Sequence, residues 1–135
     1  MTESHLMHDN CGIFGIYGNN RAGELTYFGL YSLQHRGQES AGIVTSGNGQ
    51  VHIYKGMGEV NDVFANKKYI DRLKGNIAIG HTRYSTTGAS SLTNIQPLLI
   101  TNRSQKLAIA HNGNLTNSYS LRMQLERTGS IFQTT

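Results

Sequence analysis

The chain has 135 residues, of which 37% are hydrophobic, 16 are glycine and one is cysteine, and its formal net charge is +4. This is the composition of one globular domain, and a single cysteine excludes an intrachain disulfide and fits a reducing compartment. No apolar run approaches the roughly 20 residues of a membrane helix, and residues 1–10 lack the apolar segment of a secretory signal. We therefore expect a cytoplasmic protein that has no membrane partner.

The first half of the chain predicts a strand, a helix and a hairpin after a polar leader at residues 1–10. Residues 21–35 carry apolar side chains on more than one side of a helix, which predicts a helix sandwiched between two layers. Gly37 has the place of a glycine that ends this helix. Strands are expected over 12–17, 41–45 and 51–54, with a tight turn at 46–49.

The second half predicts further strands and one amphipathic helix. Residues 59–73 are polar and are expected to be helical in part. Asn117 is placed to cap a helix that runs to about Arg127, and Gly129 follows the end of that helix. Strands are expected over 76–81, 98–101, 106–110 and 131–133. This mixture lacks the regular alternation of a parallel doubly wound sheet, so we expect the α+β class.

Three polar clusters interrupt these elements, at residues 34–40, 81–88 and 111–114. Strand ends that lead into polar loops are common places for functional sites, because a rigid element positions the loop. The notable residues of these clusters, and the single cysteine, each also have an ordinary structural interpretation. Asn112-Gly113 suits a hairpin turn, Arg83 a solvated surface, Arg36 a helix C-terminus and Cys11 a small core side chain.

The basic residues and the histidines predict neither a nucleic-acid partner nor a metal site. The nearest approach to a basic cluster is KKYIDRLK at residues 67–74, whereas a nucleic-acid surface needs a continuous basic patch. The six histidines form no HxxxH or HxH pair, the spacings that place two ligands on one metal. We expect this stretch to bind no metal or other cofactor.

Five motifs, in order, resemble the amidophosphoribosyltransferase family. They are CGIFGIYG from Cys11, LQHRGQESAGI from Leu33, GHTRYSTTG from Gly80, AHNGNL from Ala110 and GSIFQTT from Gly129. The resemblance covers residues 11–135 and implies a class II glutamine amidotransferase domain, an N-terminal-nucleophile hydrolase with a four-layer αββα sandwich. It implies that about the first half of this sandwich is present and that the phosphoribosyltransferase domain is absent, because the chain stops before the family's Ser-Asp-Thr-Glu segment.

Two alternatives stand beside this family. The glucosamine-6-phosphate synthase family resembles the chain at the cysteine and at the GHTR and HNG segments, but it typically has RGYDSAG where residues 36–42 read RGQESAG. The other alternative is a non-catalytic fragment that only binds or assembles.

The resemblance to the first family implies a reaction in two parts. Glutamine hydrolysis supplies ammonia to phosphoribosyl pyrophosphate, which yields 5-phosphoribosylamine in the first committed step of purine nucleotide synthesis. The family uses Mg2+ with phosphoribosyl pyrophosphate, and some members carry a [4Fe-4S] cluster, both outside this stretch. The implied partners are L-glutamine, phosphoribosyl pyrophosphate through the missing domain, and further copies of the full-length chain in a homo-oligomer.

The same resemblance implies roles for individual residues. Cys11 attacks the glutamine side-chain carbonyl and forms a thioester. The Asn112 side-chain amide and the Gly113 backbone N–H form the oxyanion hole. Arg83 binds the substrate α-carboxylate through two contacts, and Thr86 adds a hydroxyl contact.

Four further residues complete these expectations. Arg36 and Gly37 match the family segment that orders the surroundings of the nucleophile. His81 and His111 flank the motifs, and we expect them to pack rather than to react.

The family's nucleophile is the first residue of the mature chain, so residues 1–10 resemble a propeptide. A thiol with a pKa near 8.5 is mostly protonated at neutral pH, whereas an α-amine with a pKa of about 7.7–8.0 can take up its proton. A peptide bond between Asn10 and Cys11 turns that amine into an amide, which is no base. The leader is therefore expected to be removed before glutamine is hydrolysed, and this fragment is expected to be inactive alone.

Overall fold

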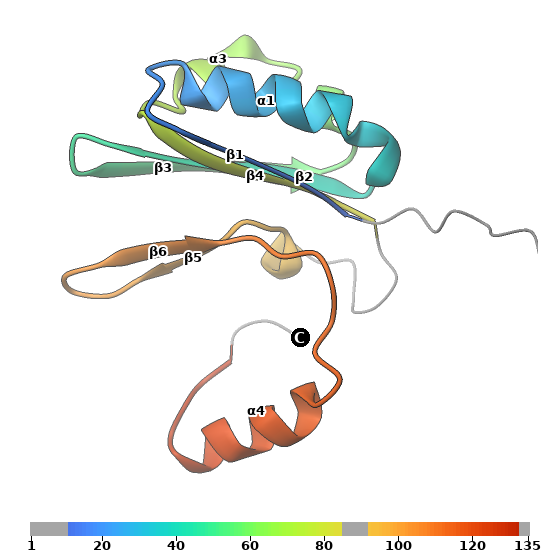
Figure 1. Cartoon of the computed structure of the whole chain (residues 1–135), viewed down its shortest axis with the longest axis vertical. Coiled ribbons are helices and arrows are strands. Elements are labelled where there is room, and N and C mark those ends of the chain that lie inside the picture. The colour runs from blue at the N-terminus through green and yellow to red at the C-terminus, as the bar shows by residue number, and fades with distance from the viewer. Residues whose placement is uncertain (1–10, 85–91, 133–135) are drawn as a thin grey trace, which may run out of the picture.

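Four layers of secondary structure stack in the order helix, sheet, sheet, helix (Figure 1). The structure, a computed structural model, describes residues 11–84 and 92–132 of the chain. The first sheet contains β1 (Gly12–Tyr17), β2 (Ser40–Gly47), β3 (Gln50–Met57) and β4 (Ile77–Arg83), and the second contains β5 (Leu98–Thr101) and β6 (Lys106–Ile109). Helices α1 (Ala22–Ser32), α2 (Val60–Val63) and α3 (Lys67–Asp71) cover the first sheet, and α4 (Ser118–Arg127) lies beyond the second. Two short 3-10 turns, η1 (Gln34–Arg36) and η2 (Leu92–Asn94), complete the order. This layering confirms the expected α+β class and the αββα order.

The first sheet is antiparallel throughout, with the strand order β1-β4-β2-β3. The hairpin between β2 and β3 turns at Asn48 and Gly49, which both have positive φ, as a two-residue type I′ turn requires. In the register, Gly12 lies opposite Thr82, and Ser40 lies opposite Arg83. The starts of β1 and β2 and the end of β4 therefore meet at one end of the sheet, where the predicted cluster at 34–40 ends and the one at 81–88 begins.

The core lies between this sheet and its helices. Leu30 from α1, Ile43 from β2 and Val60 from α2 are fully buried and belong to one cluster. Gly80 in β4 lets α1 approach closely, because a Cβ there would lie 2.6 Å from Thr26 Cγ2. Burying a Leu or Ile side chain stabilises a fold by about 1.5–3 kcal/mol, so this cluster is the main source of stability for the first two layers.

The first helix differs from the prediction at its C-terminus. α1 ends at Ser32 instead of continuing to His35, and η1 follows it. Gly37 is extended, with φ of −163°, so it is not the left-handed glycine expected to end the helix. A small residue is still needed there, because a Cβ on Gly37 would lie 2.8 Å from the backbone carbonyl carbons of Thr82 and Arg83.

The second apolar side of α1 is also used differently. The helix is the outer layer rather than the filling of a sandwich, since Phe28 and Tyr31 are about half exposed. Tyr27 makes the contact along the flank of the helix: its ring meets the Phe64 ring edge-on at 5.9 Å, and its hydroxyl donates to Asn61 Oδ1. The apolar residues on two sides thus serve the sheet below and α2 beside the helix.

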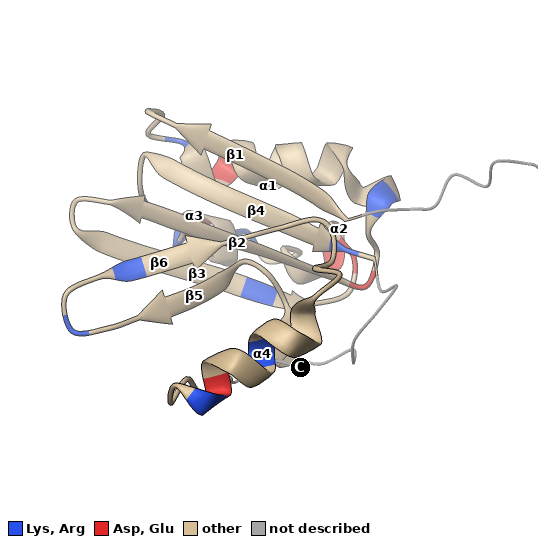
Figure 2. Ribbon diagram, turned by 60° about the horizontal axis from the view of Figure 1, so that its bottom comes forward, with Lys and Arg blue, Asp and Glu red and all other residues tan. Residues whose placement is uncertain are grey.

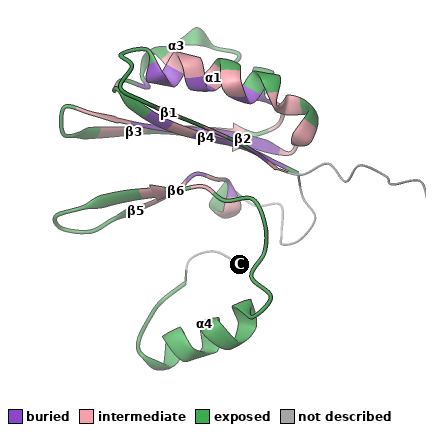
Figure 3. Cartoon of the chain, viewed as in Figure 1, coloured by how far each residue is buried: buried purple, intermediate pink, exposed green. Residues whose placement is uncertain are grey.

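The second sheet and α4 are far more exposed than the first two layers (Figure 3). Ile100 and Leu107 are more than half exposed, and none of the residues of α4 is buried. Asn117 occupies the expected N-cap position, but its side chain makes no capping hydrogen bond. Gly129 ends α4 as predicted, with positive φ.

The strand expected at 131–133 is not formed in its described part. Ile131 and Phe132 have no regular structure, and Gln133 lies outside the described residues. A strand needs a neighbour that satisfies its backbone N–H and C=O groups. The described part of the chain supplies no such neighbour for these two residues.

Candidate functional site

The sheet places Cys11 immediately before β1, at the end where β2 begins and β4 finishes. Its thiol lies 3.7 Å from the carbonyl oxygen of Tyr84, the residue that follows β4. The cysteine is half-buried, so its sulfur is not part of the core cluster. This position argues against the interpretation of Cys11 as a small core side chain.

Two of the other predicted residues meet at the backbone carbonyl of Cys11. The Asn112 side chain, from the loop after β6, donates through Nδ2 to this oxygen at 2.8 Å, across 101 residues of sequence. Arg36, in η1, donates to the same oxygen through Nε at 3.5 Å. Segments from three separate motifs are thus brought together on one peptide group.

The structure places the remaining predicted residues around this point or leaves them outside its description. Arg83 is the last residue of β4, is 9% exposed, and accepts a backbone hydrogen bond from Glu39. Gly37 packs on the backbone of Thr82 and Arg83. Gly113 has φ of +131° and is exposed, and within the described ranges its N–H makes no hydrogen bond. Thr86 lies outside the described residues.

This arrangement has the parts of an acyl-transfer site. Cys11 supplies a thiol, and a primary amide such as Asn112 has two N–H donors, of which one is engaged by the Cys11 carbonyl. The exposed Gly113 N–H is a second donor on the same loop. In acyl transfer a nucleophile attacks a carbonyl carbon, and N–H donors stabilise the carbonyl oxygen as it becomes charged.

Of the two histidines that were expected to pack, His81 is buried and His111 is not. His81, on β4, is 1% exposed, and burial lowers its pKa to about 4. Its Nε2 lies 3.2 Å from the carbonyl oxygen of His111. His111 itself is exposed, so the expected packing role is wrong for this residue. The period of two along β4 puts His81 on the same face as Ile79 and Arg83, a signal that sequence reasoning left unused.

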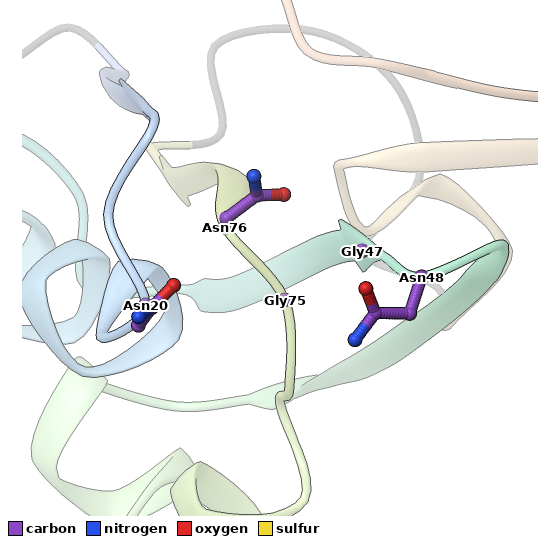
Figure 4. Close-up of a pocket in the computed structure, with 5 residues that line it drawn as sticks. All are labelled: Asn20, Gly47, Asn48, Gly75 and Asn76. Atoms are coloured by element: carbon purple, nitrogen blue, oxygen red, sulfur yellow. The ribbon is translucent and has the colours of Figure 1, made fainter.

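A polar hollow of about 380 Å³ lies elsewhere on the molecule (Figure 4). It is lined by Asn20, Gly47, Asn48, Gly75 and Asn76, none of which titrates. These residues follow β1, end β2 or precede β4, so the hollow is at the opposite end of the sheet from Cys11. It offers neither a nucleophile nor an acid or base.

The charges and the helices add no second candidate site. Lys and Arg are spread over several elements in Figure 2 rather than gathered on one face. Within residues 11–84 and 92–132, no group of three or more His, Cys, Asp or Glu side chains is arranged to hold a metal ion. None of the helices in those ranges has both the length and the apolar character of a membrane crossing.

Comparison with known proteins gives relatives over almost the whole chain. The amidophosphoribosyltransferase of Bacillus subtilis (strain 168) is 48% identical over 135 residues, which are 99% of this chain and 28% of that protein. The amidophosphoribosyltransferase of Lacticaseibacillus casei is 49% identical over 133 residues, which are 98% of this chain and 69% of that sequence. The chain thus spans about a quarter of the length of the Bacillus relative.

A solved structure gives the same result for the fold. The glutamine phosphoribosylpyrophosphate amidotransferase of B. subtilis, complexed with ADP and GMP, matches with a TM-score of 0.83 at 48% identity, over 91% of this chain and 26% of that one. No protein-family model matches the chain. The relatives carry the name of the family that the five motifs resemble, rather than that of the glucosamine-6-phosphate synthases. With this identity over more than two thirds of the Lacticaseibacillus sequence, the chain belongs to the amidophosphoribosyltransferase family.

Proposed function

We propose that this chain forms the glutamine-hydrolysing site of an enzyme that passes ammonia to phosphoribosyl pyrophosphate, the first committed step of purine nucleotide synthesis. The observation that carries the proposal is the 2.8 Å contact between Asn112 Nδ2 and the Cys11 carbonyl oxygen. It joins a thiol nucleophile and an amide donor, and acyl transfer uses both. The phosphoribosyl part of the proposal rests on family membership alone, because the chain spans about a quarter of the Bacillus relative.

The proposed chemistry proceeds through a thioester. Cys11 Sγ bonds to the side-chain carbonyl carbon of glutamine, and the π electrons of the carbonyl move to its oxygen. The second N–H of Asn112 and the N–H of Gly113 stabilise this oxyanion. As the tetrahedral intermediate collapses, its C–N bond breaks and the nitrogen leaves as ammonia with a proton from the base. Water then hydrolyses the γ-glutamyl thioester to glutamate and restores the thiol.

The base in this proposal is the α-amine of Cys11, which exists after the bond to Asn10 is cut. An α-amine titrates closer to neutral pH than a lysine does, so it can take the thiol proton and return it to the leaving ammonia. Residues 1–10, which lie outside the described residues, are thus a propeptide in this proposal. With that leader in place, the site is assembled but has no base.

Substrate binding is assigned to the end of β4. Arg83 binds the α-carboxylate of glutamine, for which its planar guanidinium can make two parallel contacts. Thr86, three residues further along the chain, adds a hydroxyl contact. Arg36 and Gly37 support the Cys11 carbonyl and the β4 backbone, in keeping with the contacts that they make. Residues 11–135 are then part of the glutaminase domain.

The proposal places the remaining components outside this stretch. Mg2+ accompanies phosphoribosyl pyrophosphate in the phosphoribosyltransferase domain, any [4Fe-4S] cluster has its ligands elsewhere, and the thiol–amine chemistry itself requires no metal. The complete protein is a cytoplasmic homo-oligomer without nucleic-acid or membrane partners, and a reducing compartment keeps Cys11 a free thiol.

The test uses the complete product of the gene that encodes this chain. Removal of one oxyanion donor costs about 10²–10³ in kcat. We expect Asn112→Ala to reduce glutamine-dependent product formation by this factor, with ammonia-dependent formation unchanged because free ammonia bypasses the site. Asn20→Ala, an exposed asparagine in the hollow at the opposite end of the sheet, is the matched control and should leave both rates unchanged. A glutamine-dependent rate within a few-fold of wild type in Asn112→Ala would favour the turn interpretation of Asn112.

A further inference from the structure

Two side chains from separate segments bind both backbone groups of His111. His81 on β4 lies with Nε2 3.2 Å from the His111 carbonyl oxygen, and Gln96, in the loop before β5, accepts from the His111 N–H through Oε1 at 2.7 Å. These contacts span 30 and 15 residues of sequence. His111 immediately precedes Asn112, so a clamp on its backbone fixes the point from which the Asn112 side chain extends.

The loop at residues 111–114 is weakly packed. Residues 111–114 are exposed and lack regular structure, and no atom lies within 4 Å of the place where a Cβ on Gly113 would be. A loop with so little packing samples many conformations unless specific hydrogen bonds hold it. The Asn112 amide nevertheless reaches the Cys11 carbonyl oxygen at 2.8 Å. The two hydrogen bonds to the His111 backbone are placed to maintain this orientation of the Asn112 amide.

We propose that His81 and Gln96 are positioning residues for glutamine hydrolysis: they hold the N–H and C=O of His111 and so direct the Asn112 amide at the nucleophile. The inference rests on the proposed function of the site. Within the described residues, neither side chain forms a hydrogen bond with Cys11, so both act through the loop rather than on the reacting atoms.

The chemistry of His81 fits a neutral hydrogen-bond donor. A carbonyl oxygen only accepts, so the contact to His111 requires the proton on Nε2. The other ring nitrogen, Nδ1, is buried without a hydrogen-bond partner in the described part of the chain. A second proton there would create a buried, unpaired charge. His81 is therefore held in the neutral Nε2–H form, which donates but does not exchange protons with the site near neutral pH.

The Gln96 arm is anchored on the first sheet. The backbone carbonyl oxygen of Gln96 lies 2.4 Å from the place where a Cβ on Gly42 would be, so the absence of a side chain in β2 lets the loop sit directly on the sheet. Lys55 on β3 donates through Nζ to the carbonyl oxygen of the preceding residue, Ile95, which is fully buried. His81 and Gln96 are thus both held by the first sheet, and their hydrogen bonds fix the position of the loop relative to that sheet.

The test compares variants of the complete gene product that remove or keep each hydrogen bond. His81→Leu and Gln96→Met remove the donor and the acceptor with little change in volume, whereas His81→Gln keeps an N–H donor of similar reach. We expect the first two to lower the glutamine-dependent kcat by about 10–100-fold, below the loss from deleting a direct oxyanion donor. The KM for glutamine and the ammonia-dependent rate should change by less than about threefold, and His81→Gln should recover most of the kcat. His52→Leu on β3 is the matched histidine control.

Hydrogen exchange supplies a readout that does not depend on activity. Amides of residues 111–114 should exchange faster in His81→Leu and Gln96→Met than in wild type, while those of the hairpin turn at 46–49 should not change. If exchange rises but wild type hydrolyses no glutamine, the proposed function fails and the clamp stands. If wild type is active and the variants change neither exchange nor kcat, the clamp is wrong. Equal loss of the glutamine and ammonia activities, without recovery in His81→Gln, would also overturn a positioning role.

Discussion

The two halves of the stack contrast in how firmly they are packed. The first sheet and its helices hold a continuous buried cluster around Leu30 and Ile43. The second sheet and α4 carry exposed apolar side chains, including Ile100, Leu107 and Leu121. The candidate site draws the nucleophile from the first half and the amide donor Asn112 from the second. The hydrogen bonds of Asn112 with Cys11 and of His81 with His111 therefore join the two parts of the site.

The largest expected loss of unfolding free energy comes from a substitution in the well-packed half. Leu30→Ala leaves a cavity at a fully buried position, and such changes cost about 2–5 kcal/mol in the free energy of unfolding. Leu121→Ala on α4, where the side chain is 38% exposed, should cost less than about 1 kcal/mol. Urea denaturation of the purified protein measures both. Equal costs would mean that the two halves are packed alike.

A second test concerns the histidine that links the halves. The folded-state pKa of His81 is about 4 against an ordinary value of 6.5, because burial disfavours the charged ring. The hydrogen bond to the His111 backbone raises this pKa in part, whereas the charges of His111 and Arg83 lower it further. The unfolded chain takes up this proton below pH 6.5 and the folded chain does not until about pH 4. The resulting stability is complete above pH 6.5 and is lost as the pH falls toward 4, by about 3 kcal/mol in all.

Unfolding free energies of wild type and His81→Gln between pH 7.5 and 4.5 measure this contribution. The glutamine variant cannot titrate at this position, so its stability should fall less over that range. The other histidines and the carboxylates affect both proteins equally and cancel in the difference. Parallel curves for the two proteins would show that position 81 does not resist protonation.

The smallest expected effect lies on α4. Arg122 pairs with Glu126 at 3.0 Å and lies over the Phe132 ring at 4.8 Å, with both members of the ion pair more than 40% exposed. An exposed helix pair is worth about 0.3–0.5 kcal/mol and an exposed cation–π contact about 0.5–1 kcal/mol. Arg122→Ala should therefore lower the unfolding free energy by no more than about 1.5 kcal/mol, and 1 M salt should reduce the difference. A loss as large as that of Leu30→Ala would show that α4 is packed far better than its exposure indicates.

Local signals predicted much of the first half. The strand at 12–17 and the Asn48-Gly49 turn have short-range causes, an apolar run beside glycine and a pair of residues that tolerate positive φ. Errors arose where distant contacts decide. Gly37 was assigned to the helix end, but its size is required by the β4 backbone, which is far away in the sequence.

The residues of the candidate site could be predicted from the sequence, but the residues that hold them in position could not. The motifs supplied Cys11, Arg36 and Asn112, which the fold brings to one carbonyl group. His81 and His111 look equivalent in the sequence, since each follows a strand-like run and opens a polar cluster. Their difference comes from tertiary structure, because β4 is central in its sheet whereas β6 borders an exposed loop. Gln96 gave no sequence signal at all.

The contact of Cys11 with Asn112 also sets an order of events during synthesis. The two residues are 101 positions apart, and a ribosome that adds roughly 5–20 residues per second needs about 5–20 s to make the segment between them. For that time Cys11 has been synthesised but Asn112 has not. Any reaction that needs both residues, including one on the Asn10–Cys11 bond, can begin only when the growing chain is long enough to close this contact. The time needed to synthesise the intervening chain therefore delays the formation of the site around the nucleophile.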